Sequence, residues 1–320
     1  MTHTDVAATA VAMPAGLVRL TDWGVIRASG EDARKFLHGQ LTQDIEHLDG
    51  ARAHLAGYCT AKGRLLATFV VWRRAPDDLL LACSADVLTA VLKRLSMFVM
   101  RAKCKLSDAS AEWPLWGLAG ASAVQALGAL APSTPWQRVA AGAGDVIRLP
   151  DAACDAQGGA GVPRFLWAGA EPPALPALDP QAWRWLEVKS GVVRVQAATV
   201  EQFVPQMVNL ELVGGVNFQK GCYPGQEVVA RSQYRGTLKR RGQVVDSAVP
   251  LMPGQEIFHD GDPGQPAGMV ALSGAWAGSH AALVEVKLAA LQAGGLHAGA
   301  ADGPTLTLAA LPYEIPAEAA

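Results

Sequence analysis

Hydrophobic residues in the first hundred positions follow two different periods. Residues 63–74 (GRLLATFVVWRR) and 77–84 (DDLLLACS) are short apolar runs with a turn-like segment between them, and they predict two buried strands. From Leu88 to Val99 the apolar residues recur at helical spacing, which predicts a helix over residues 86–99 with one apolar face. Strands followed by a helix in this order favour an α+β layer.

Polar residues at turn and cap positions mark further elements. Residues 20–30 (LTDWGVIRASG) predict a strand, and the helix after it is expected to begin at Ser29 as its N-cap and to end at Gly39. Another helix is expected at the pair Asp179–Pro180, which suits the N-cap and the first helical position, and it should run to Gly191.

Two long segments have the composition of loops or of short strands. Residues 142–180 are rich in Gly, Pro and Ala, and we expect them to form a connection with few regular elements. After about Val245, short apolar runs are broken every few residues by Gly and Pro. This pattern predicts a small β-barrel or sandwich of about 75 residues at the C-terminal end.

Composition and charge argue against several classes of protein. The chain has 320 residues, half of them hydrophobic, so it can form two or three domains with a sizeable core. Its net charge of −2 does not suggest a general binder of polyanions, and no apolar run reaches the ~18 residues of a membrane span. The N-terminal segment lacks the basic region of a secretory signal, and the five cysteines contain no CxxC pair. We therefore expect a cytoplasmic protein with no disulfide framework and no metal site.

The least ordinary segment is 218–236 (FQKGCYPGQEVVARSQYRG). Its residues Tyr223–Pro224–Gly225–Gln226 suit a type II turn, because Pro fixes φ at the second position and Gly accepts a positive φ at the third. A short helix is expected to follow, with Glu227 in its first turn. The turn would present Cys222 at a stiff corner, where Lys220 and the helix N-terminus favour a thiolate.

The same segment leaves alternatives open. Glu227 would oppose a thiolate if it faced the sulfur, and a free cysteine is more often a small buried hydrophobe. Six basic residues and one acid lie between Lys220 and Arg241, a local balance of +5. A solvated helix face explains most such runs, whereas a concentrated excess in an acidic protein also suits an anionic ligand or partner.

These residues resemble the signature K-G-C-[YF]-x-G-Q-E of the YgfZ family. Its members are folate-binding proteins related to the aminomethyltransferase (T-protein, GcvT) of the glycine cleavage system and to mitochondrial iron–sulfur assembly factors. Residues 20–45, 201–218 and 311–316 (LPYEIP) are similar to further segments of the family. The resemblance covers the chain from about Leu17.

The resemblance implies an α+β fold, a GcvT-like ring of three domains around a central channel that holds tetrahydrofolate. Residues 1–15 would then be a disordered N-terminus. Residues 16–245 would form the folate-binding region, two interwoven α+β subdomains with one lobe at roughly 51–110. Residues 246–320 would form the C-terminal β-barrel.

The resemblance also implies site residues. Two tryptophans of the family's folate site fall on Trp23 and Trp183, whose indole faces would stack on a flat pterin or aminobenzoyl ring. The alternative for each is a core tryptophan. Cys222 would be the reactive thiol, with Lys220 beside it. The remaining candidates for cofactor binding belong to the signature segment and are Tyr223, Gln226, Glu227 and Arg231.

At two places the sequence departs from the T-protein pattern. An acidic pair of that transferase falls on Ala67 and Thr68, so no obvious group would activate a folate nitrogen for one-carbon transfer. A pterin-binding glutamate falls on Lys189, although Glu187 lies nearby and could replace it. An aminomethyltransferase activity is therefore not expected.

Three functions compete. The first is a folate-binding accessory protein that supports assembly or repair of iron–sulfur enzymes and, through them, tRNA modification. Its partners would be reduced folate and iron–sulfur assembly proteins or client enzymes. The second is a folate-dependent one-carbon transferase. The third is an RNA-binding module that uses the basic run with Tyr223 and Tyr234, but the net acidity makes direct nucleic-acid binding the weakest of the three.

Overall fold

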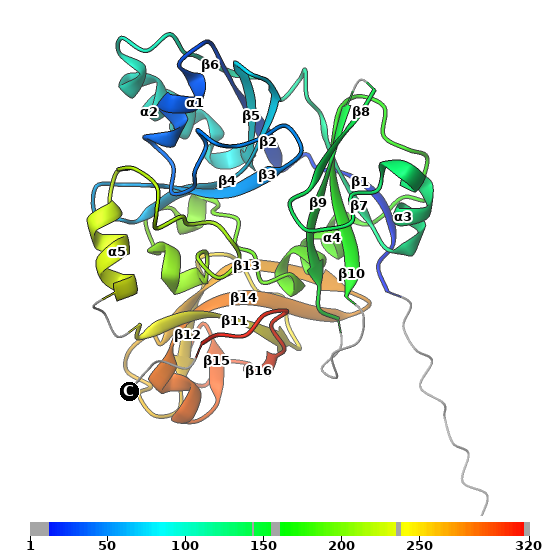
Figure 1. The fold of residues 1–320 in the computed structure, drawn as a ribbon. Helices are drawn as coiled ribbons and strands as arrows, with labels where there is room; N and C mark the ends of the chain where they lie inside the picture. Colours follow the sequence, from blue (N-terminus) through cyan, green and yellow to red (C-terminus); the bar gives the residue numbers. More distant parts are fainter. Residues whose placement is uncertain (1–12, 143, 155–160, 235–237, 317–320) are drawn as a thin grey trace, which may run out of the picture.

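Two five-stranded antiparallel sheets and a closed barrel make up the fold (Figure 1). The computed structural model describes residues 13–142, 144–154, 161–234 and 238–316. Most of the expected disordered N-terminus, residues 1–15, lies outside the described residues. The mixed α+β class and the C-terminal barrel are confirmed.

The first sheet has the strand order β3–β4–β5–β2–β6 and carries two helices. Its elements are β2 (Trp23–Ser29), α1 (Ala33–His38), β3 (Ala53–Cys59), β4 (Leu65–Ala75), β5 (Asp78–Ser84), α2 (Ala85–Val99) and β6 (Lys105–Asp108). The two strands and the helix predicted between residues 63 and 99 are confirmed. Because β2 belongs to this sheet, the first lobe also includes residues before the expected start at 51.

The predicted start of the helix after β2 was wrong. Ser29 is the last residue of β2, and Asp32 is the N-cap of α1. The strand extends to Ser29 because it pairs with Asp78 of β5 and Lys105 of β6. Gly39 follows the last helical residue, as expected.

The second sheet has the order β1–β7–β10–β9–β8. Its elements are β1 (Gly16–Arg19), β7 (Leu115–Ala119), α3 (Ala121–Leu127), the 3-10 turn η1 (Gly128–Leu130), β8 (Arg138–Ala141), β9 (Gly144–Ala152) and β10 (Val162–Ala168). The expectation of few regular elements over residues 142–180 was therefore wrong. Pairs such as Val146 with Trp167 form a buried ladder, and their short apolar runs are flanked by the Gly, Pro and Ala that dominate the composition.

The barrel closes in the order β11–β14–β13–β12–β15–β16. Its elements are β11 (Arg240–Ser247), β12 (Glu256–His259), β13 (Gly268–Trp276), β14 (Ser279–Lys287), η4 (Leu288–Gln292), β15 (Leu296–Ala298) and β16 (Thr305–Ala309). Its first strand begins before the expected boundary at residue 246. None of the described helices has the length and apolar composition needed to cross a bilayer.

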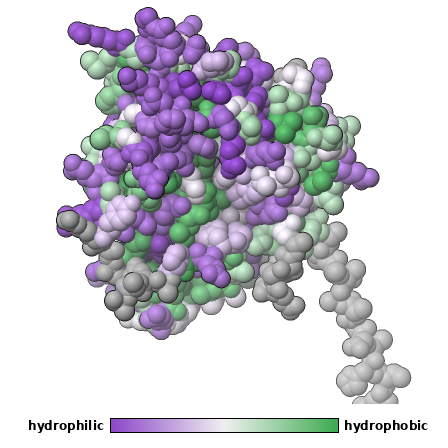
Figure 2. Space-filling model, in the orientation of Figure 1, coloured by the Kyte–Doolittle hydropathy of each residue, from purple (hydrophilic) through white to green (hydrophobic). Residues whose placement is uncertain are grey.

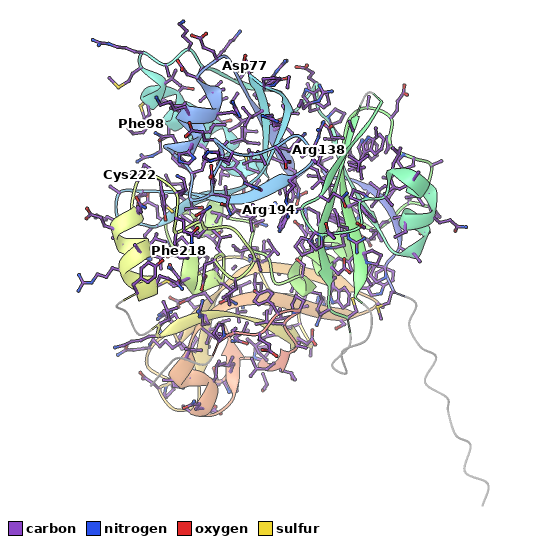
Figure 3. All side chains as sticks on the ribbon, viewed as in Figure 1. Asp77, Phe98, Arg138, Arg194, Phe218 and Cys222 are labelled. Carbon is purple, nitrogen blue, oxygen red and sulfur yellow. The ribbon has the colours of Figure 1, made fainter. Side chains whose placement is uncertain are left out.

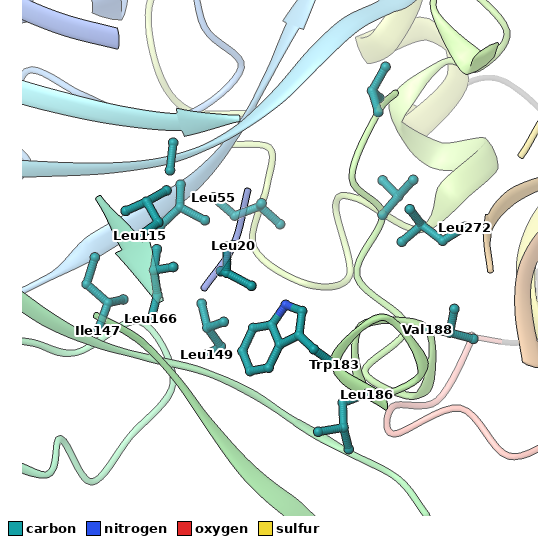
Figure 4. Close-up of a cluster of buried hydrophobic side chains, with 14 of the residues drawn as sticks. Leu20, Leu55, Leu115, Ile147, Leu149, Leu166, Trp183, Leu186, Val188 and Leu272 are labelled. Carbon is teal, nitrogen blue, oxygen red and sulfur yellow. The ribbon is translucent and has the colours of Figure 1, made fainter. Parts of the chain in front are cut away.

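Helix α4 (Pro180–Lys189) joins the second sheet to the barrel through contacts with β9, β13 and β14. It begins as predicted: Asp179 is the N-cap, and its carboxylate accepts a hydrogen bond from the Gln181 amide at 2.8 Å. Figure 4 shows Trp183 projecting from this helix among Leu20, Leu149 and Leu166. The remaining elements are η2 (Ala197–Thr199), η3 (Pro205–Val208) and α5 (Gln226–Tyr234).

Candidate functional site

A central cavity lies where the two sheets meet α4 and the segment after it. Residues from both sheets line it, together with the start of the 190–196 segment; they include Trp23, Thr68, Trp136, Arg164, Glu187 and Arg194. A water-sized sphere can occupy about 30 Å³ of the space inside it, which is room for about two water molecules. Side chains thus leave little free space in the cavity in this conformation.

Charged side chains at the cavity are paired with one another. The Arg194 guanidinium donates to both Glu187 carboxylate oxygens at 3.1 Å, and to Asp22 Oδ2 at 3.0 Å. It also donates to Ser84 Oγ at 2.9 Å. Burial alone would lower the pKa of Arg194, but the carboxylates of Glu187 and Asp22 outweigh it and raise the pKa. This bidentate, hydrogen-bonded arrangement keeps a buried charge fully compensated.

Trp23 reaches this cluster from the start of β2. The Arg194 guanidinium carbon lies 4.9 Å from the centre of the Trp23 ring, a cation–π contact. The indole Nε1 of Trp23 is buried and makes no hydrogen bond among the described residues. The indole N–H groups of five other tryptophans are buried in the same way (Trp113, Trp167, Trp183, Trp185 and Trp276), so this N–H alone does not mark a binding position.

Trp183, the second predicted folate tryptophan, does not line the cavity. It is 1% exposed and packs so closely on β7 that a Cβ added at Gly117 would lie 2.6 Å from its ring. Arg164 stands nearer the cavity, with its guanidinium carbon 5.5 Å from the centre of the Trp183 ring. Burial lowers the pKa of Arg164 to about 10. Of the two predicted tryptophans, the structure brings only Trp23 to the cavity.

The two residues at the positions of the transferase acids, Ala67 and Thr68, lie on opposite faces of β4. Ala67 is buried on the other face of β4, and Thr68 lines the cavity, where its hydroxyl accepts from the Val195 amide at 3.1 Å. Lys189 turns away toward the barrel, and its ammonium lies 2.6 Å from Asp246 Oδ1. Glu187 is therefore the carboxylate of α4 that faces the cavity.

Sequence reasoning missed several cavity residues. Arg164 and Arg194 were not selected, although each is a charge inside an apolar run (VPRFLWA and GVVRVQ), and that is a usable signal for a buried ion pair. Trp136 lines the cavity from a left-handed backbone conformation with φ of 66°. Nothing in its neighbourhood in the sequence marks that conformation.

The Cys222 corner is built by the predicted turn. Gly225 has φ of +80°, and the Gln226 amide donates to the Tyr223 carbonyl at 3.2 Å, as a type II turn requires. The turn packs on the loop between β3 and β4, where a Cβ on Gly225 would lie 2.6 Å from the Cα of Gly63. Helix α5 begins at Gln226, and Cys222 is exposed in front of it.

Lys220 lies near Cys222 and also makes contacts that the sequence did not predict. Its side chain is buried, and its ammonium donates to the carbonyl oxygen of His38 and, at 2.9 Å, to that of Leu41. The ammonium also lies 4.8 Å from the centre of the Tyr223 ring. Burial lowers the pKa of Lys220 to about 8. The lysine therefore ties the cysteine segment to the end of α1.

The basic run is largely neutralised within the protein. Arg240 donates to both Glu285 carboxylate oxygens at 2.9 Å, and Arg241 pairs with buried Glu211. Exposed positions in the described part of the run are Arg231 and Lys239. Tyr223 is buried, so it offers no stacking surface to RNA. The described part of the run thus presents less unpaired charge than its sequence indicates.

Figure 3 shows the two sites apart, with Arg194 toward the middle of the molecule and Cys222 beside α5. The other signature residues remain with Cys222: Gln226 is half-buried, and Glu227 and Arg231 are exposed on α5. The cavity lining contains none of the candidates Tyr223, Gln226, Glu227 and Arg231. Hydrophilic residues cover much of the face above α5, over the lobe with α1 and α2 (Figure 2).

The sequence of this chain is similar to a known domain family and to named bacterial proteins. Residues 2–149 match the family model described as the GCVT N-terminal domain. A tRNA-modifying protein YgfZ from Edwardsiella ictaluri is 36% identical over 238 residues, which are 71% of this chain and 70% of that protein. The protein of the same name from Photorhabdus laumondii is 34% identical over 232 residues, with the same shares of 71% and 70%.

Among solved structures, the glycine cleavage system aminomethyltransferase T from Bartonella henselae has a similar fold. Its TM-score is 0.69, at 17% identity, over 94% of this chain and 86% of that chain. At this level of identity the likeness concerns the fold alone.

Proposed function

The chain belongs to the YgfZ family, and from that premise we propose that it is a folate-binding accessory protein of the cytoplasm that supports assembly or repair of iron–sulfur enzymes and, through them, tRNA modification. The names of its relatives support the tRNA-modification part of this proposal. The aminomethyltransferase-like fold supports the folate part. The observation that carries it is the cavity between the two sheets, which Trp23 and Trp136 line beside the ion pair of Glu187 and Arg194.

The residues at the cavity fit tetrahydrofolate in their chemistry. Trp23 and Trp136 offer ring faces to a flat heterocycle, and in a widened cavity the buried Trp23 Nε1 would become a hydrogen-bond donor. Glu187 offers a carboxylate to the amino group and ring N–H of a pterin. A bound reduced folate supplies a carrier of one-carbon units.

Binding requires the cavity to widen. A pterin ring is larger than the space for about two water molecules that the cavity now holds. The side chain that must yield is Trp136, on the connection before β8, since the strands are fixed by their ladders and Arg194 is held by Glu187, Asp22 and Ser84. Strain at Trp136, with φ of 66°, favours it as the part that moves.

Cys222 is the reactive group of the proposal, handling a thiol, persulfide or oxidised sulfur. Its exposure supports this role, because the sulfur can meet a partner protein or a small molecule without any opening of the fold. Replacing Cys222 with Ala should leave folding intact and lower the activity of iron–sulfur enzymes in cells.

The test of folate binding is a calorimetric titration with tetrahydrofolate of the wild type, Trp23→Phe and Trp276→Phe. Trp23→Phe keeps a ring and removes the N–H, and it should weaken binding about five- to ten-fold, the value of one hydrogen bond to a buried donor. Trp276 lies on the barrel and its Nε1 is also buried without a partner, so it is a matched control that should leave the affinity unchanged. Equal affinity in all three proteins would contradict the assignment of Trp23 to the folate site.

A folate-dependent one-carbon transferase is the alternative. It is the weaker proposal because Thr68, not a carboxylate, faces the cavity from β4. A carbon balance on purified protein with tetrahydrofolate and a one-carbon donor separates the two functions. We expect no appreciable aminomethyl transfer, and turnover comparable to that of a T-protein would favour the alternative.

A further inference from the structure

Arg164, on strand β10, is a buried arginine that forms no ion pair with a carboxylate of the described residues. Two other arginines there are buried to a similar degree: Arg194 is 4% exposed and Arg241 is 6% exposed, against 3% for Arg164. Arg194 donates to Glu187, and Arg241 pairs with Glu211. Arg164 thus differs from the other buried arginines in lacking a counter-charge bonded to it.

Most of the N–H groups of Arg164 are unused. Its Nε donates to the Pro150 carbonyl at 3.1 Å. A guanidinium has five N–H donors, and the remaining ones make no hydrogen bond within the part of the chain that the structure describes. The guanidinium carbon lies 5.5 Å from the centre of the Trp183 ring, whose face attracts the charge but supplies no acceptor oxygen. Because buried cations are normally paired and hydrogen-bonded, these donors indicate a missing acceptor.

The carboxylates nearest to Arg164 are bonded elsewhere. Glu187 and Asp151 act on it through their charge, but this only partly opposes the effect of burial, which lowers the pKa of Arg164 to about 10. Arg194 takes Glu187, and Arg148 takes Asp151. The charged residues that line the cavity are Arg164, Arg194 and Glu187, so one positive charge remains once the ion pair is discounted. The cavity therefore favours a ligand that places an anionic or strongly accepting oxygen at Arg164.

The position of Arg164 is fixed by the second sheet. It lies in the middle strand of three, paired with Ala119 of β7 and with Leu149 of β9. When Trp136 yields to admit a ligand, this strand stays in its ladder and keeps the guanidinium at the cavity wall.

We propose that Arg164 donates to the 4-oxo oxygen of a bound pterin and so selects 4-oxo over 4-amino pterins. This inference rests on the proposed binding of folate in the central cavity, and it names the part of the ligand that this wall recognises. A pterin carries its 2-amino group, a ring N–H and the 4-oxo oxygen in that order along one edge. Glu187 accepts from the first two, and Arg164 donates to the third with a charge-assisted hydrogen bond.

A 4-amino pterin does not match this wall. Its amino group puts N–H donors where the oxygen stood, so the donors of Arg164 remain unpaired and the ligand's own donors face a cation. A site built to bond one polar group rejects an analogue that lacks it more strongly than an apolar pocket rejects a change of size.

The same arrangement predicts that Arg164 contributes little to the stability of the ligand-free protein. A buried charge without a bonded counter-charge pays its desolvation cost without full compensation, and replacing such a group with an apolar side chain of similar length is often neutral or stabilising. Arg164→Met should therefore unfold at the same urea concentration as the wild type or at a higher one, although it binds the ligand more weakly.

The test is an anaerobic calorimetric titration with tetrahydrofolate and with its 4-amino analogue, tetrahydroaminopterin. The wild type should bind tetrahydrofolate at least about ten-fold more tightly than the analogue. Arg164→Met should lose at least about ten-fold in affinity for tetrahydrofolate and none for the analogue, so the ratio of the two affinities falls. A thermodynamic cycle over the two ligands and two proteins isolates the contact between Arg164 and the 4-oxo oxygen.

Arg148→Met is the matched control. Arg148 lies on the neighbouring strand β9, and its guanidinium also stands over an aromatic ring, 4.9 Å from the centre of Phe165. It pairs with Asp151 and is not among the residues that line the cavity. Arg148→Met should therefore keep the wild-type affinities for both ligands.

The outcomes separate the inference from the function on which it rests. If the wild type does not bind tetrahydrofolate, the proposed folate function fails. If the wild type binds it and Arg164→Met keeps the wild-type ratio of the two affinities, the role of Arg164 is overturned while the folate site stands. If Arg164→Met unfolds at a much lower urea concentration than the wild type, the arginine is structural and the inference is likewise overturned.

Discussion

The central cavity and the Cys222 corner differ in how their charged groups are paired and in how exposed their functional groups are. At the cavity, Arg194 and Glu187 are almost fully buried, and each satisfies the other through two hydrogen bonds. At the corner, Cys222 is exposed, and the buried cation beside it, Lys220, binds backbone carbonyls instead of a counter-charge. The first arrangement holds three parts of the chain together, and the second fixes the backbone and leaves the functional atom free.

This difference shows why a signature segment and a binding cavity need not coincide. Two residues of the signature that were candidates for the site, Lys220 and Tyr223, are buried and anchor the corner. The cavity instead uses residues that are scattered along the chain, with Asp22 and Arg194 separated by 172 positions. Variants that disturb only one of the two regions therefore test whether the regions are structurally independent.

The largest effect should come from Arg194→Met. It leaves Glu187 buried without its partner and Asp22 without one of its two, and breaking a buried pair in this way costs about 3–5 kcal/mol of unfolding free energy. Urea denaturation measures the loss. Arg184, a more exposed partner of the same Asp22, is the control, and Arg184→Met should cost less than about 1 kcal/mol. Equal costs would mean that the cavity pair does not hold the fold.

Gly225→Ala should have the next largest effect. The positive φ alone costs about 1–2 kcal/mol, and a Cβ there would collide with the β3–β4 loop, adding about 1–3 kcal/mol. Gly214→Ala separates the two causes, because Gly214 has the same φ of +80° and nothing within 4 Å of the added Cβ. If Gly225→Ala and Gly214→Ala unfold at the same urea concentration, the packing of the turn against the loop is not what fixes the corner.

Local signals explain what could be predicted of the fold. The turn at Tyr223–Gln226, the N-cap at Asp179 and the apolar face of α2 each depend on residues within a few positions of one another, and all three were found. Strand β9 was missed because its stability comes from pairing with β10 across a Gly- and Ala-rich connection.

The site was harder to predict for the same physical reason. The ion pairs of Arg194 join positions far apart in the sequence, and no local pattern records them. The packing that buries Trp183 is likewise tertiary, as are the hydrogen bonds from Lys220 to the carbonyls of His38 and Leu41. Resemblance to a family identified the motif, whereas only the structure showed that its residues do not line the cavity.

The cysteines differ in burial, and we expect their thiols to differ in reactivity. Burial raises the pKa of Cys59 and Cys83 to about 12 and that of Cys104 to about 11, so these thiols stay protonated near neutral pH. Exposed Cys222 should therefore react with iodoacetamide at pH 8 at least about ten-fold faster than any of them. Alkylation read per cysteine by mass spectrometry measures this, and a rate for Cys222 no higher than for Cys59 would contradict it.

A further effect concerns the pH dependence of stability at Lys220. Burial lowers its pKa in the folded state from 10.5 to about 8, so between these values the unfolded chain holds the proton more tightly. The unfolding free energy of the wild type should then rise with pH across this window, relative to Lys220→Met. Exposed Lys62 is the control, since Lys62→Met should run parallel to the wild type. A constant difference between wild type and Lys220→Met would mean that the lysine is not held in a poorly solvated position.

One set of titrations tests most directly whether the folate cavity and the thiol corner are separate sites. Tetrahydrofolate is titrated calorimetrically into the wild type, Trp23→Ala and Cys222→Ala. We predict that Cys222→Ala binds as tightly as the wild type and that Trp23→Ala binds at least about ten-fold more weakly, the loss of an aromatic face and a hydrogen bond. If the wild type does not bind, or if Cys222→Ala loses affinity as strongly as Trp23→Ala, the two-site account is wrong.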